Sequence, residues 1–371
     1  MDSALLTTCY NFAAARQVLE KVIAQCAFPG ASVAVTCGDK PVWIEGLGNF
    51  TYAPDSPAVT RETIFDLASL SKVVVTTTAA MLLYERGALA LDSAVPDLLP
   101  GFLPKPSDPR WNQVTVEMLL CHSSGLPGYS PLYNVATSSQ EFIHGIFDVG
   151  LQAEPGSRME YSDLGFILLG FILEQVAGEP LSAFSQREVF QPLGMTKTAF
   201  NPPEAWRVYI PPTEEDQDYR HRVIQGEVHD ENASFLGGVA GHAGLFSTSE
   251  DIGRFALCLL RGGVPILRSD TVDLFTRRAA SPSGTSRALG WDTPSPPSQS
   301  GVYFGPRSYG HLGFTGTSLW IDPDRELSVT LLTNRTWPDR KSQEIRRVRP
   351  EFHDRVVEAL SRLETFSLKE E

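Results

Sequence analysis

Apolar residues recur every three or four positions in several stretches of the chain, which is the spacing of one helix face. The most regular stretch runs from Leu164 to Ala177 and is followed by Gly178, a residue that commonly ends a helix. Ser249 is a suitable residue to cap the start of another helix, because its hydroxyl can accept a free backbone N–H there. We predict helices over residues 11–26, 116–121, 139–149, 164–177, 181–190 and 350–364, and one that begins at Ser249.

Short runs rich in β-branched residues predict strands near both ends of the chain. They occupy residues 31–37 and 42–48, and again 317–321 and 327–333, with a short turn inside each pair. Strands at both ends with mostly helices between them favour one antiparallel sheet flanked by terminal helices, with a helical insertion. We therefore expect a mixed α/β fold, with residues 1–60 and 240–371 as a sheet domain and residues 61–239 as a mainly helical subdomain.

Three stretches lack a periodic pattern. Residues 96–113 are rich in proline and aspartate, and residues 280–300 in serine, proline and glycine. We expect both to be loops, the second of them mobile. Residues 201–233 are proline-rich and charged, and their length predicts functional loops or a lid.

The composition narrows the class of protein. Of 371 residues, 42% are apolar and 20% are charged, which is typical of a globular protein, and the net charge of −13 argues against nucleic acid and anionic membranes as partners. No signal peptide and no membrane-spanning run is evident. The cysteines at 9, 26, 37, 121 and 258 lack metal-type spacing, so we expect reduced thiols and a cytoplasmic location.

A serine and a lysine, Ser69 and Lys72, stand three residues apart where an apolar helix begins. Residues at this spacing share a helix face, so the hydroxyl and the amine can meet. Free N–H groups at a helix start favour negative charge, so Ser69 could attack a carbonyl while its own N–H stabilises the oxyanion. Such a pair also arises by chance, and the alternative is a capping serine beside a lysine whose stem lies on apolar surface.

Other candidate groups lie further along the chain. Tyr161 precedes a helix, where its phenol could reach a groove, although a structural hydrogen bond is the commoner role. His311 stands at a strand start near glycines, or is simply a solvated residue at the strand end. His122 lies beside two serines, but the chain has no Gly-x-Ser-x-Gly motif. His229 and His242 lack the helical spacing of a zinc site, so we predict no metal.

Taken in order, three motifs resemble those of the class C β-lactamase and penicillin-binding-protein superfamily of active-site serine hydrolases. That superfamily, which includes family VIII carboxylesterases and D-amino-acid peptidases, has Ser-x-x-Lys, Tyr-x-Asn and Lys/His-x-Gly. Here they are Ser69-Leu70-Ser71-Lys72, Tyr161-Ser162-Asp163 and His311-Leu312-Gly313. Residues 122–127, 244–248 and 313–317 also resemble it, and the match covers roughly residues 28–335.

The resemblance implies a β-lactamase/transpeptidase-like fold with the active site in a groove between an antiparallel sheet and an all-helical subdomain. It implies that Ser69 is acylated by a small ester or amide, and that Lys72 and Tyr161 share the general acid and base work. The N–H groups of Ser69 and Phe314 would form the oxyanion hole. Tyr129, Asp163, His311 and Gly313 would bind substrate. No metal or cofactor is implied.

The second and third motifs depart from the usual pattern. Asp163 stands where the superfamily usually has asparagine, and we expect its carboxylate within ion-pair reach of Lys72, holding the amine protonated. His311 replaces lysine and is largely neutral at pH 7, so it binds a substrate carboxylate less firmly. Both changes predict weak hydrolysis of β-lactams.

Two classes of function remain open at this point. The first is a hydrolase: a carboxylesterase on short acyl esters is favoured, with a D-amino-acid or muropeptide amidase, a D,D-carboxypeptidase or a weak β-lactamase as alternatives. The second is a binding or sensor protein that keeps the fold without efficient turnover.

Overall fold

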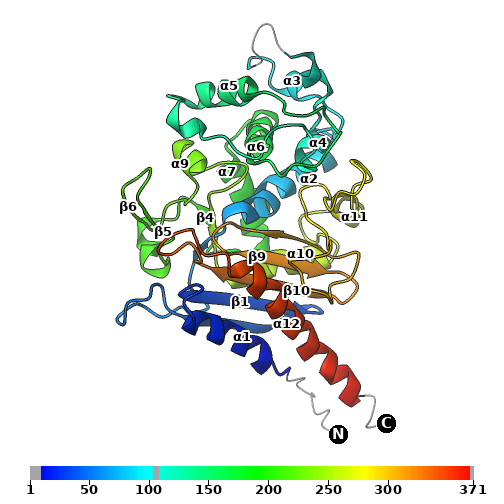
Figure 1. The fold of residues 1–371 in the computed structure, drawn as a ribbon. Helices are drawn as coiled ribbons and strands as arrows, with labels where there is room; N and C mark the ends of the chain where they lie inside the picture. Colours follow the sequence, from blue (N-terminus) through cyan, green and yellow to red (C-terminus); the bar gives the residue numbers. More distant parts are fainter. Residues whose placement is uncertain (1–9, 103–107, 368–371) are drawn as a thin grey trace.

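The structure is a computed structural model that describes residues 10–102 and 108–367, with residues 362–367 described by their backbone only. A sheet covered by helices forms one half of the molecule, and a mainly helical part forms the other (Figure 1).

The main sheet is built from both ends of the chain. Its strand order is β2-β1-β10-β9-β8, and neighbouring strands are antiparallel. β1 lies beside β10 in a register that pairs Ala31 with Thr333 and Cys37 with Leu327. The bounds are Gly30–Cys37 (β1), Lys40–Gly48 (β2), Tyr309–Leu312 (β8), Ser318–Asp322 (β9) and Leu327–Thr333 (β10). The expected antiparallel sheet, closed by the two chain ends, is confirmed.

Helices cover both faces of this sheet. The terminal helices α1 (Ala13–Ala24) and α12 (Ile345–Ser367) lie together on one face, and α10 (Ser249–Leu260) packs on the other (Figure 1). Successive side chains of β1 point to opposite faces of the sheet. Val33 and Val35 belong to the apolar cluster under α1 and α12. On the other face, the Ser32 hydroxyl forms a hydrogen bond with the Ser249 hydroxyl in α10 (2.8 Å).

The helical part is formed by the middle of the chain. Its helices are α2 (Thr78–Glu85), α3 (Val95–Leu98), α4 (Val116–Leu120), α5 (Ser139–Val149), α6 (Asp163–Ala177), α7 (Leu181–Ser185), α8 (Gln191–Leu193) and α9 (Glu231–Phe235), with α11 (Ser269–Thr276) beside α2. Short 3-10 or π turns cover Ala68–Leu70 (η1), Lys72–Thr77 (η2), Pro109–Gln113 (η3), Leu132–Asn134 (η4), Gln186–Phe190 (η5) and Glu204–Tyr209 (η6). The small strands are Phe65–Asp66 (β3), Ala199–Phe200 (β4), Glu214–Asp216 (β5), Arg222–Ile224 (β6) and Leu245–Ser247 (β7).

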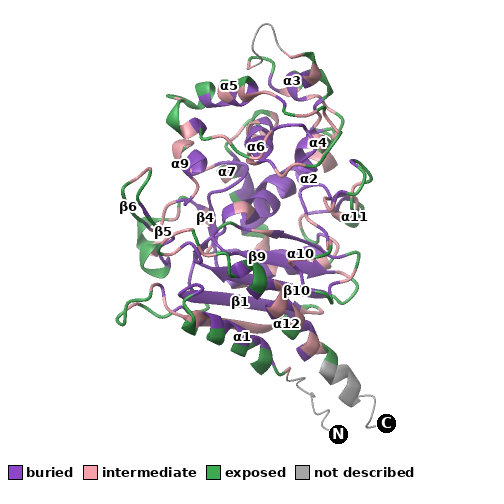
Figure 2. Ribbon diagram, in the orientation of Figure 1, coloured by how far each residue is buried: buried purple, intermediate pink, exposed green. Residues whose placement is uncertain are grey.

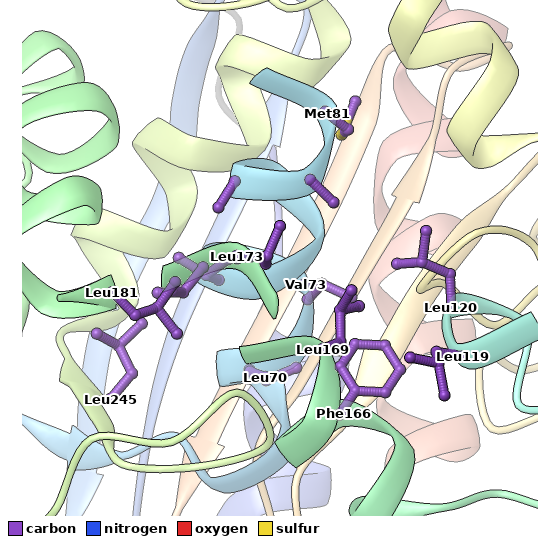
Figure 3. Packing of buried hydrophobic residues seen from close by; sticks show 14 of the residues in the cluster. Leu70, Val73, Met81, Leu119, Leu120, Phe166, Leu169, Leu173, Leu181 and Leu245 are labelled. Carbon is purple, nitrogen blue, oxygen red and sulfur yellow. The ribbon is translucent and has the colours of Figure 1, made fainter. Parts of the chain in front are cut away.

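The segment from η1 to α2 and the helix α6 run through the centre of this part, and both are mostly buried apart from the last turn of α6 (Figure 2). Figure 3 shows Leu70 and Val73 of the first segment packed against Leu169 and Leu173 of α6. Burial of large apolar side chains stabilises a protein by about 1.5–3 kcal/mol each, so this contact fixes the two elements relative to each other. Those two elements carry the first two sequence motifs.

Several expectations about individual segments are wrong. Residues 201–233 are not irregular throughout: they contain η6, the β5–β6 hairpin and the start of α9. Residues 96–113 include parts of α3 and η3, and residues 103–107 lie outside the described part. Thr248, not Ser249, caps α10, because its hydroxyl accepts the N–H of Asp251 (3.1 Å). Residues 280–300, in contrast, contain no helix or strand, as expected for a loop. Asp292 and Gly310 exchange backbone hydrogen bonds that join this loop to β8.

No single helix in the described residues is long and apolar enough to cross a membrane. Among the described residues, α6 and the following segment Leu181–Leu193 are long and apolar enough only when taken together, and they are bent by 74° relative to each other.

Candidate active site

Ser69 lies in the turn η1, directly after strand β3. The preceding residue, Ala68, has φ of +46°, a left-handed conformation that costs a non-glycine residue about 1 kcal/mol or more. Hydrogen bonds hold it there: the Ala68 N–H donates to Asp66 Oδ1 (2.8 Å), and the Leu67 N–H donates to the Leu245 carbonyl (2.9 Å). Strained backbone of this kind concentrates at functional sites, where it fixes the direction of one side chain.

Lys72 is fully buried, and its ammonium group is held by three acceptors. Lys72 Nζ donates to Ser69 Oγ (2.9 Å), to Asp163 Oδ1 (2.7 Å) and to the carbonyl of His242 (3.1 Å). The contact between Lys72 and Asp163 is the one expected from the sequence. An ammonium group has three hydrogens, and these contacts direct one of them at the serine.

The charge state of Lys72 follows from these neighbours. Burial by itself lowers the pKa of a lysine, but the charge of Asp163 and the contact with Tyr161 outweigh it, so the pKa of Lys72 is raised above its ordinary value. The resting amine is therefore protonated at neutral pH.

Tyr161 lies over Lys72 and between two histidines. Its ring centroid is 5.0 Å from Lys72 Nζ, 4.5 Å from the ring of His122 and 5.9 Å from that of His311. Burial raises the pKa of the phenol, and the positive charge of Lys72 lowers it only in part. Tyr161 therefore also holds its proton at rest.

His122 positions the second motif. Its Nδ1 accepts the backbone N–H of Ser162 (3.0 Å), and the Ser162 hydroxyl in turn caps α6 by accepting the N–H of Gly165 (3.2 Å). Burial, with Arg287 and Lys72 nearby, lowers the pKa of His122 well below 6.5, so its ring is neutral. This arrangement fixes where the chain passes from Tyr161 to Asp163.

His311 is buried, with 2% of its surface exposed, so the alternative of a solvated residue at the strand end is wrong. Its Nδ1 lies 2.8 Å from the carbonyl of Leu312. Burial, followed by the charges of Arg287 and Lys72, lowers the pKa of His311 well below 6.5. It therefore brings no positive charge to the site.

The loop after His311 lies against the strand that leads to Ser69. The hydroxyl of Thr315 donates to the Asp66 carbonyl (2.8 Å), and that of Thr317 donates to the Leu67 carbonyl (2.9 Å). Gly313 is required for this approach, because a Cβ there would lie 1.9 Å from the Thr317 hydroxyl and 2.5 Å from the Leu67 carbonyl.

The N–H groups of Ser69 and Phe314, which are the expected oxyanion donors, belong to the two segments that these bonds join. Both residues line the same cavity, and neither N–H donates a hydrogen bond within the described residues. Two free N–H groups beside a serine hydroxyl form the arrangement that an acyl-transfer site needs.

The cavity has a volume of about 850 Å³ and contains every candidate from the three motifs except the buried Lys72. Tyr129 lies on its wall and is 46% exposed. Sequence reasoning missed five arginines that also line it: Arg287, Arg335, Arg340, Arg346 and Arg349. They come from separate loops and from α12, so no local motif marks them.

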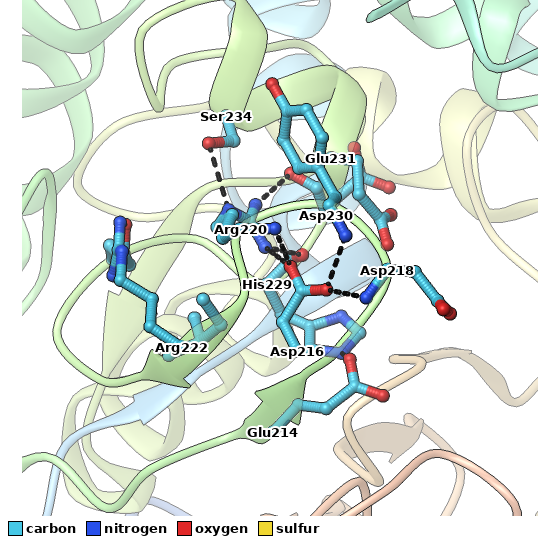
Figure 4. Close-up of polar contacts among 12 residues, drawn as sticks. Glu214, Asp216, Asp218, Arg220, Arg222, His229, Asp230, Glu231 and Ser234 are labelled. Carbon is cyan, nitrogen blue, oxygen red and sulfur yellow. Dashed lines mark hydrogen bonds and ion pairs between the residues drawn. The ribbon is translucent and has the colours of Figure 1, made fainter. Parts of the chain in front are cut away.

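A polar network forms the wall of the cavity beside the β5–β6 hairpin (Figure 4). Asp216 accepts the N–H groups of residues 218–220, and the Arg220 guanidinium donates to the carbonyls of residues 228–230. The two histidines considered as metal ligands each bond one carboxylate instead: His229 Nε2 lies 2.8 Å from Glu214, and His242 Nε2 lies 2.8 Å from Asp230. The described part of the chain has no group of three side chains suited to hold a metal.

A model of the beta-lactamase family matches residues 15–351. The chain belongs to the beta-lactamase family. The membership confirms the resemblance seen in the three motifs, and the observed fold is the expected β-lactamase/transpeptidase-like one.

Relatives of this beta-lactamase family member include a protein of Escherichia coli (strain K12) named "Putative D-alanyl-D-alanine carboxypeptidase". It is 34% identical over 309 residues, which cover 74% of this chain and 70% of the relative. A protein of Salmonella typhimurium with the same name is 34% identical over 308 residues, with the same coverage.

Solved structures show the same fold at lower identity. EstCE1, described as a hydrolase with promiscuous acyltransferase activity, has a TM-score of 0.75 and 24% identity, and the alignment covers 93% of this chain and 97% of EstCE1. The octameric penicillin-binding protein homologue from Pyrococcus abyssi has a TM-score of 0.72 and 21% identity, covering 94% of this chain and 77% of the homologue.

Proposed function

We propose that this member of the family is a serine hydrolase that acts through an acyl-enzyme on Ser69. The observation that carries the proposal is the 2.9 Å contact between Ser69 Oγ and Lys72 Nζ, in a cavity that also contains Tyr161 and two free N–H groups. A purely structural lysine would need no contact with an accessible serine hydroxyl. The contact therefore favours an enzyme over a binding or sensor protein.

The first step is attack by Ser69 Oγ on the substrate carbonyl carbon. Lys72 and Tyr161 both hold protons at rest, so one of them must lose a proton before it can accept that of Ser69. The oxyanion then lies against the N–H groups of Ser69 and Phe314. The accepted proton passes to the leaving group as the carbonyl carbon–oxygen or carbon–nitrogen bond breaks.

The second step releases the acyl group. Water attacks the carbonyl carbon of the acyl-enzyme, gives one proton to the same base, and Ser69 Oγ leaves and takes that proton back. The cycle regenerates the free Ser69 hydroxyl and the deprotonated base, and it yields the carboxylic acid.

Short acyl esters are the substrates that this site favours most directly. An alcohol or phenol leaves with less help from a proton donor than an amine does, and the neutral His311 offers no charge to a substrate carboxylate. We therefore propose a carboxylesterase-type activity on short acyl esters.

A second candidate is hydrolysis of small peptides with a free carboxylate, of the D-alanyl-D-alanine type. The exposed Arg346 in the cavity wall favours it, because its guanidinium pairs with no carboxylate among the described residues and could bind that of a substrate. Arg340 and Arg287, by contrast, already face carboxylates of the protein. The name of the Escherichia coli relative points to the same substrate class.

The test compares p-nitrophenyl butyrate with D-alanyl-D-alanine peptides and nitrocefin. In the chain with Ser69→Ala, turnover of every substrate should fall by several orders of magnitude, because no acyl-enzyme can form. Tyr161→Phe should be similarly impaired while still folded. Ser139→Ala, which changes an exposed serine, is the matched control. Turnover near the wild-type rate in Ser69→Ala would refute the proposal.

A further inference from the structure

Arg349 in α12 is a buried arginine that the mechanism above does not use. Only 5% of its surface is exposed, and no carboxylate among the described residues lies within ion-pair distance of it. Its Nη2 donates to two backbone carbonyls instead, those of Gly313 (2.9 Å) and Thr317 (2.8 Å). A buried cation bonded only to neutral carbonyls is costly, so its position calls for an explanation.

The first of these carbonyls belongs to the peptide group that carries the Phe314 N–H. In one peptide group the carbonyl and the N–H share the delocalised electrons of the amide, so a donor at the oxygen polarises the N–H. Chains of hydrogen bonds strengthen one another in this way by about 10–30% per bond. A charged donor has a larger effect than a neutral one.

The other expected oxyanion donor has the same construction. The Ser69 N–H shares its peptide group with the Ala68 carbonyl, and that carbonyl accepts the hydroxyl of Ser71 (2.7 Å). Ser71 is itself fully buried, and its hydroxyl oxygen accepts the N–H of Leu245 (3.1 Å). Each of the two peptide groups therefore has a side-chain donor on its oxygen and a free N–H toward the cavity.

We propose that Arg349 and Ser71 are positioning residues of the oxyanion hole. Each fixes the plane of one peptide group and strengthens its N–H as a hydrogen-bond donor at the moment when negative charge forms on the substrate oxygen. Arg349 adds a positive charge behind that donor, and no carboxylate of the described residues lies within ion-pair distance to neutralise it. This inference rests on the proposed acyl-enzyme mechanism.

The test measures steady-state hydrolysis of p-nitrophenyl butyrate. Arg349→Gln should lower kcat by about 10- to 100-fold, less than the loss of an oxyanion donor itself, with KM little changed. Arg349→Lys keeps the charge and one donor, so it should recover part of the rate. Arg347→Gln removes an equal charge from the exposed face of the same helix, where Arg347 pairs with Glu344 and Glu351, and should have little effect.

Ser71→Ala is the corresponding change at the other peptide group. It should lower kcat by about tenfold or less, because Ser71 is a neutral donor and Arg349 a charged one. Each carbonyl also keeps one backbone donor, the N–H of Ser71 on Ala68 and that of Gly316 on Gly313. Its control is Ser185→Ala. Ser185 is also buried, and its hydroxyl donates to the helix carbonyl of Leu181 at a place away from the cavity.

A spectroscopic readout separates positioning from a general loss of structure. The acyl-enzyme formed from p-nitrophenyl butyrate labelled with carbon-13 at the carbonyl has an infrared stretch that falls as the oxyanion hole bonds it more strongly. Arg349→Gln and Ser71→Ala should raise that frequency, whereas Arg347→Gln and Ser185→Ala should leave it unchanged. If Arg349→Gln does not fold, Arg349→Lys and Ser71→Ala carry the same test.

The outcomes distinguish this inference from the function on which it rests. Hydrolysis that survives Ser69→Ala refutes both. A second outcome refutes the positioning role alone. In it, hydrolysis depends on Ser69, but Arg349→Gln and Ser71→Ala leave both kcat and the carbonyl frequency unchanged. A rise in KM at constant kcat would assign Arg349 to substrate binding and would also overturn it.

Discussion

The ion pair between Lys72 and Asp163 decides how many protons the site holds at rest. Its 2.7 Å separation, with Lys72 fully buried, keeps the ammonium form. The motif that the sequence resembles has asparagine at this place, whereas this chain has a carboxylate. Its consequence is a site that needs a higher pH before either Lys72 or Tyr161 can act as a base.

Replacing Asp163 with asparagine tests this consequence. Asp163 raises the pKa of Lys72, so its removal should lower that pKa, and the basic amine should become available at lower pH. The rising limb of kcat/KM against pH should move down by about 1 to 3 units, the usual effect of an opposite charge at this distance. Asp270→Asn, at an exposed carboxylate, should leave the profile in place. An unmoved limb in Asp163→Asn would show that Lys72 does not set it.

His311 gives a second test at this scale. Its neutral ring is weaker toward an anion than a lysine by about 1 kcal/mol, roughly a fivefold change. His311→Lys should therefore raise the ratio of kcat/KM for nitrocefin to that for p-nitrophenyl butyrate by about that factor. The wild-type chain should hydrolyse the ester readily and nitrocefin poorly. Equal rates for the two in the wild-type chain would contradict the preference for esters.

Spacing along the chain was sufficient to predict some contacts and not others. Ser69 and Lys72 meet because they are three residues apart on one turn, and Asp163 follows from the motif order. The burial of His311 depends on segments far away in sequence, so its own neighbours indicated a solvated residue. The five arginines have no common motif and are brought together only by the fold.

At the scale of elements, long apolar helices were predicted well because their core face repeats in sequence. The predicted helix 164–177 is α6, Asp163–Ala177. The helix predicted over 350–364 instead begins at Ile345 and contains Pro350. Pro350 has no N–H to donate to the carbonyl of Arg346, and the Gln299 side chain donates to it instead (3.0 Å). Because Gln299 is far away in the sequence, the residues around Pro350 gave no sign of this contact.

The β5–β6 hairpin was missed for a related reason. Its strands are short. The Asp216 carboxylate holds the turn between them, and the Arg220 side chain holds the backbone that follows the hairpin. Polar tertiary contacts of this kind leave no periodic signal in the sequence.

The contact between α6 and the glycine-rich segment 237–244 leads to a prediction about stability and activity together. A Cβ on Gly241 would lie 2.1 Å from the Phe166 carbonyl, so Gly241→Ala must push the segment away from α6. The unfolding free energy should fall by about 1–3 kcal/mol, and activity should fall as well, since the next residue supplies the His242 carbonyl to Lys72.

Chemical denaturation and ester hydrolysis measure these two effects. Gly178→Ala is the comparison, because Gly178 ends α6 with φ of +70° and no atom within 4 Å of its Cβ position. It should cost about 1 kcal/mol of stability and leave kcat unchanged. Equal activity in the two variants would mean that the position of the His242 carbonyl does not matter.

At the scale of the whole molecule, the order of strands and helices along the chain predicted the architecture. Strands at both ends with helices between allow few compact arrangements, and the three motifs pointed to one of them. The boundaries at residues 60 and 240 stay a prediction. The net charge of −13 gave no hint of a cavity lined by arginines, because a sum over the chain does not report where charges lie.

The pairing of β1 with β10 also has a consequence for synthesis on the ribosome. The last residue of β1 is Cys37, and its partner in β10, Leu327, is made some 290 residues later, which takes about 15 to 60 s at ordinary elongation rates. During that time Val33 and Val35 have no sheet partner on that side and no α12 above them. Stalled nascent chains that end before Leu327 should therefore be cleaved by protease within residues 30–48, and longer chains that expose all of α12 should resist. Protection of residues 30–48 in the shorter chains would show that β1 and β2 fold without their partner.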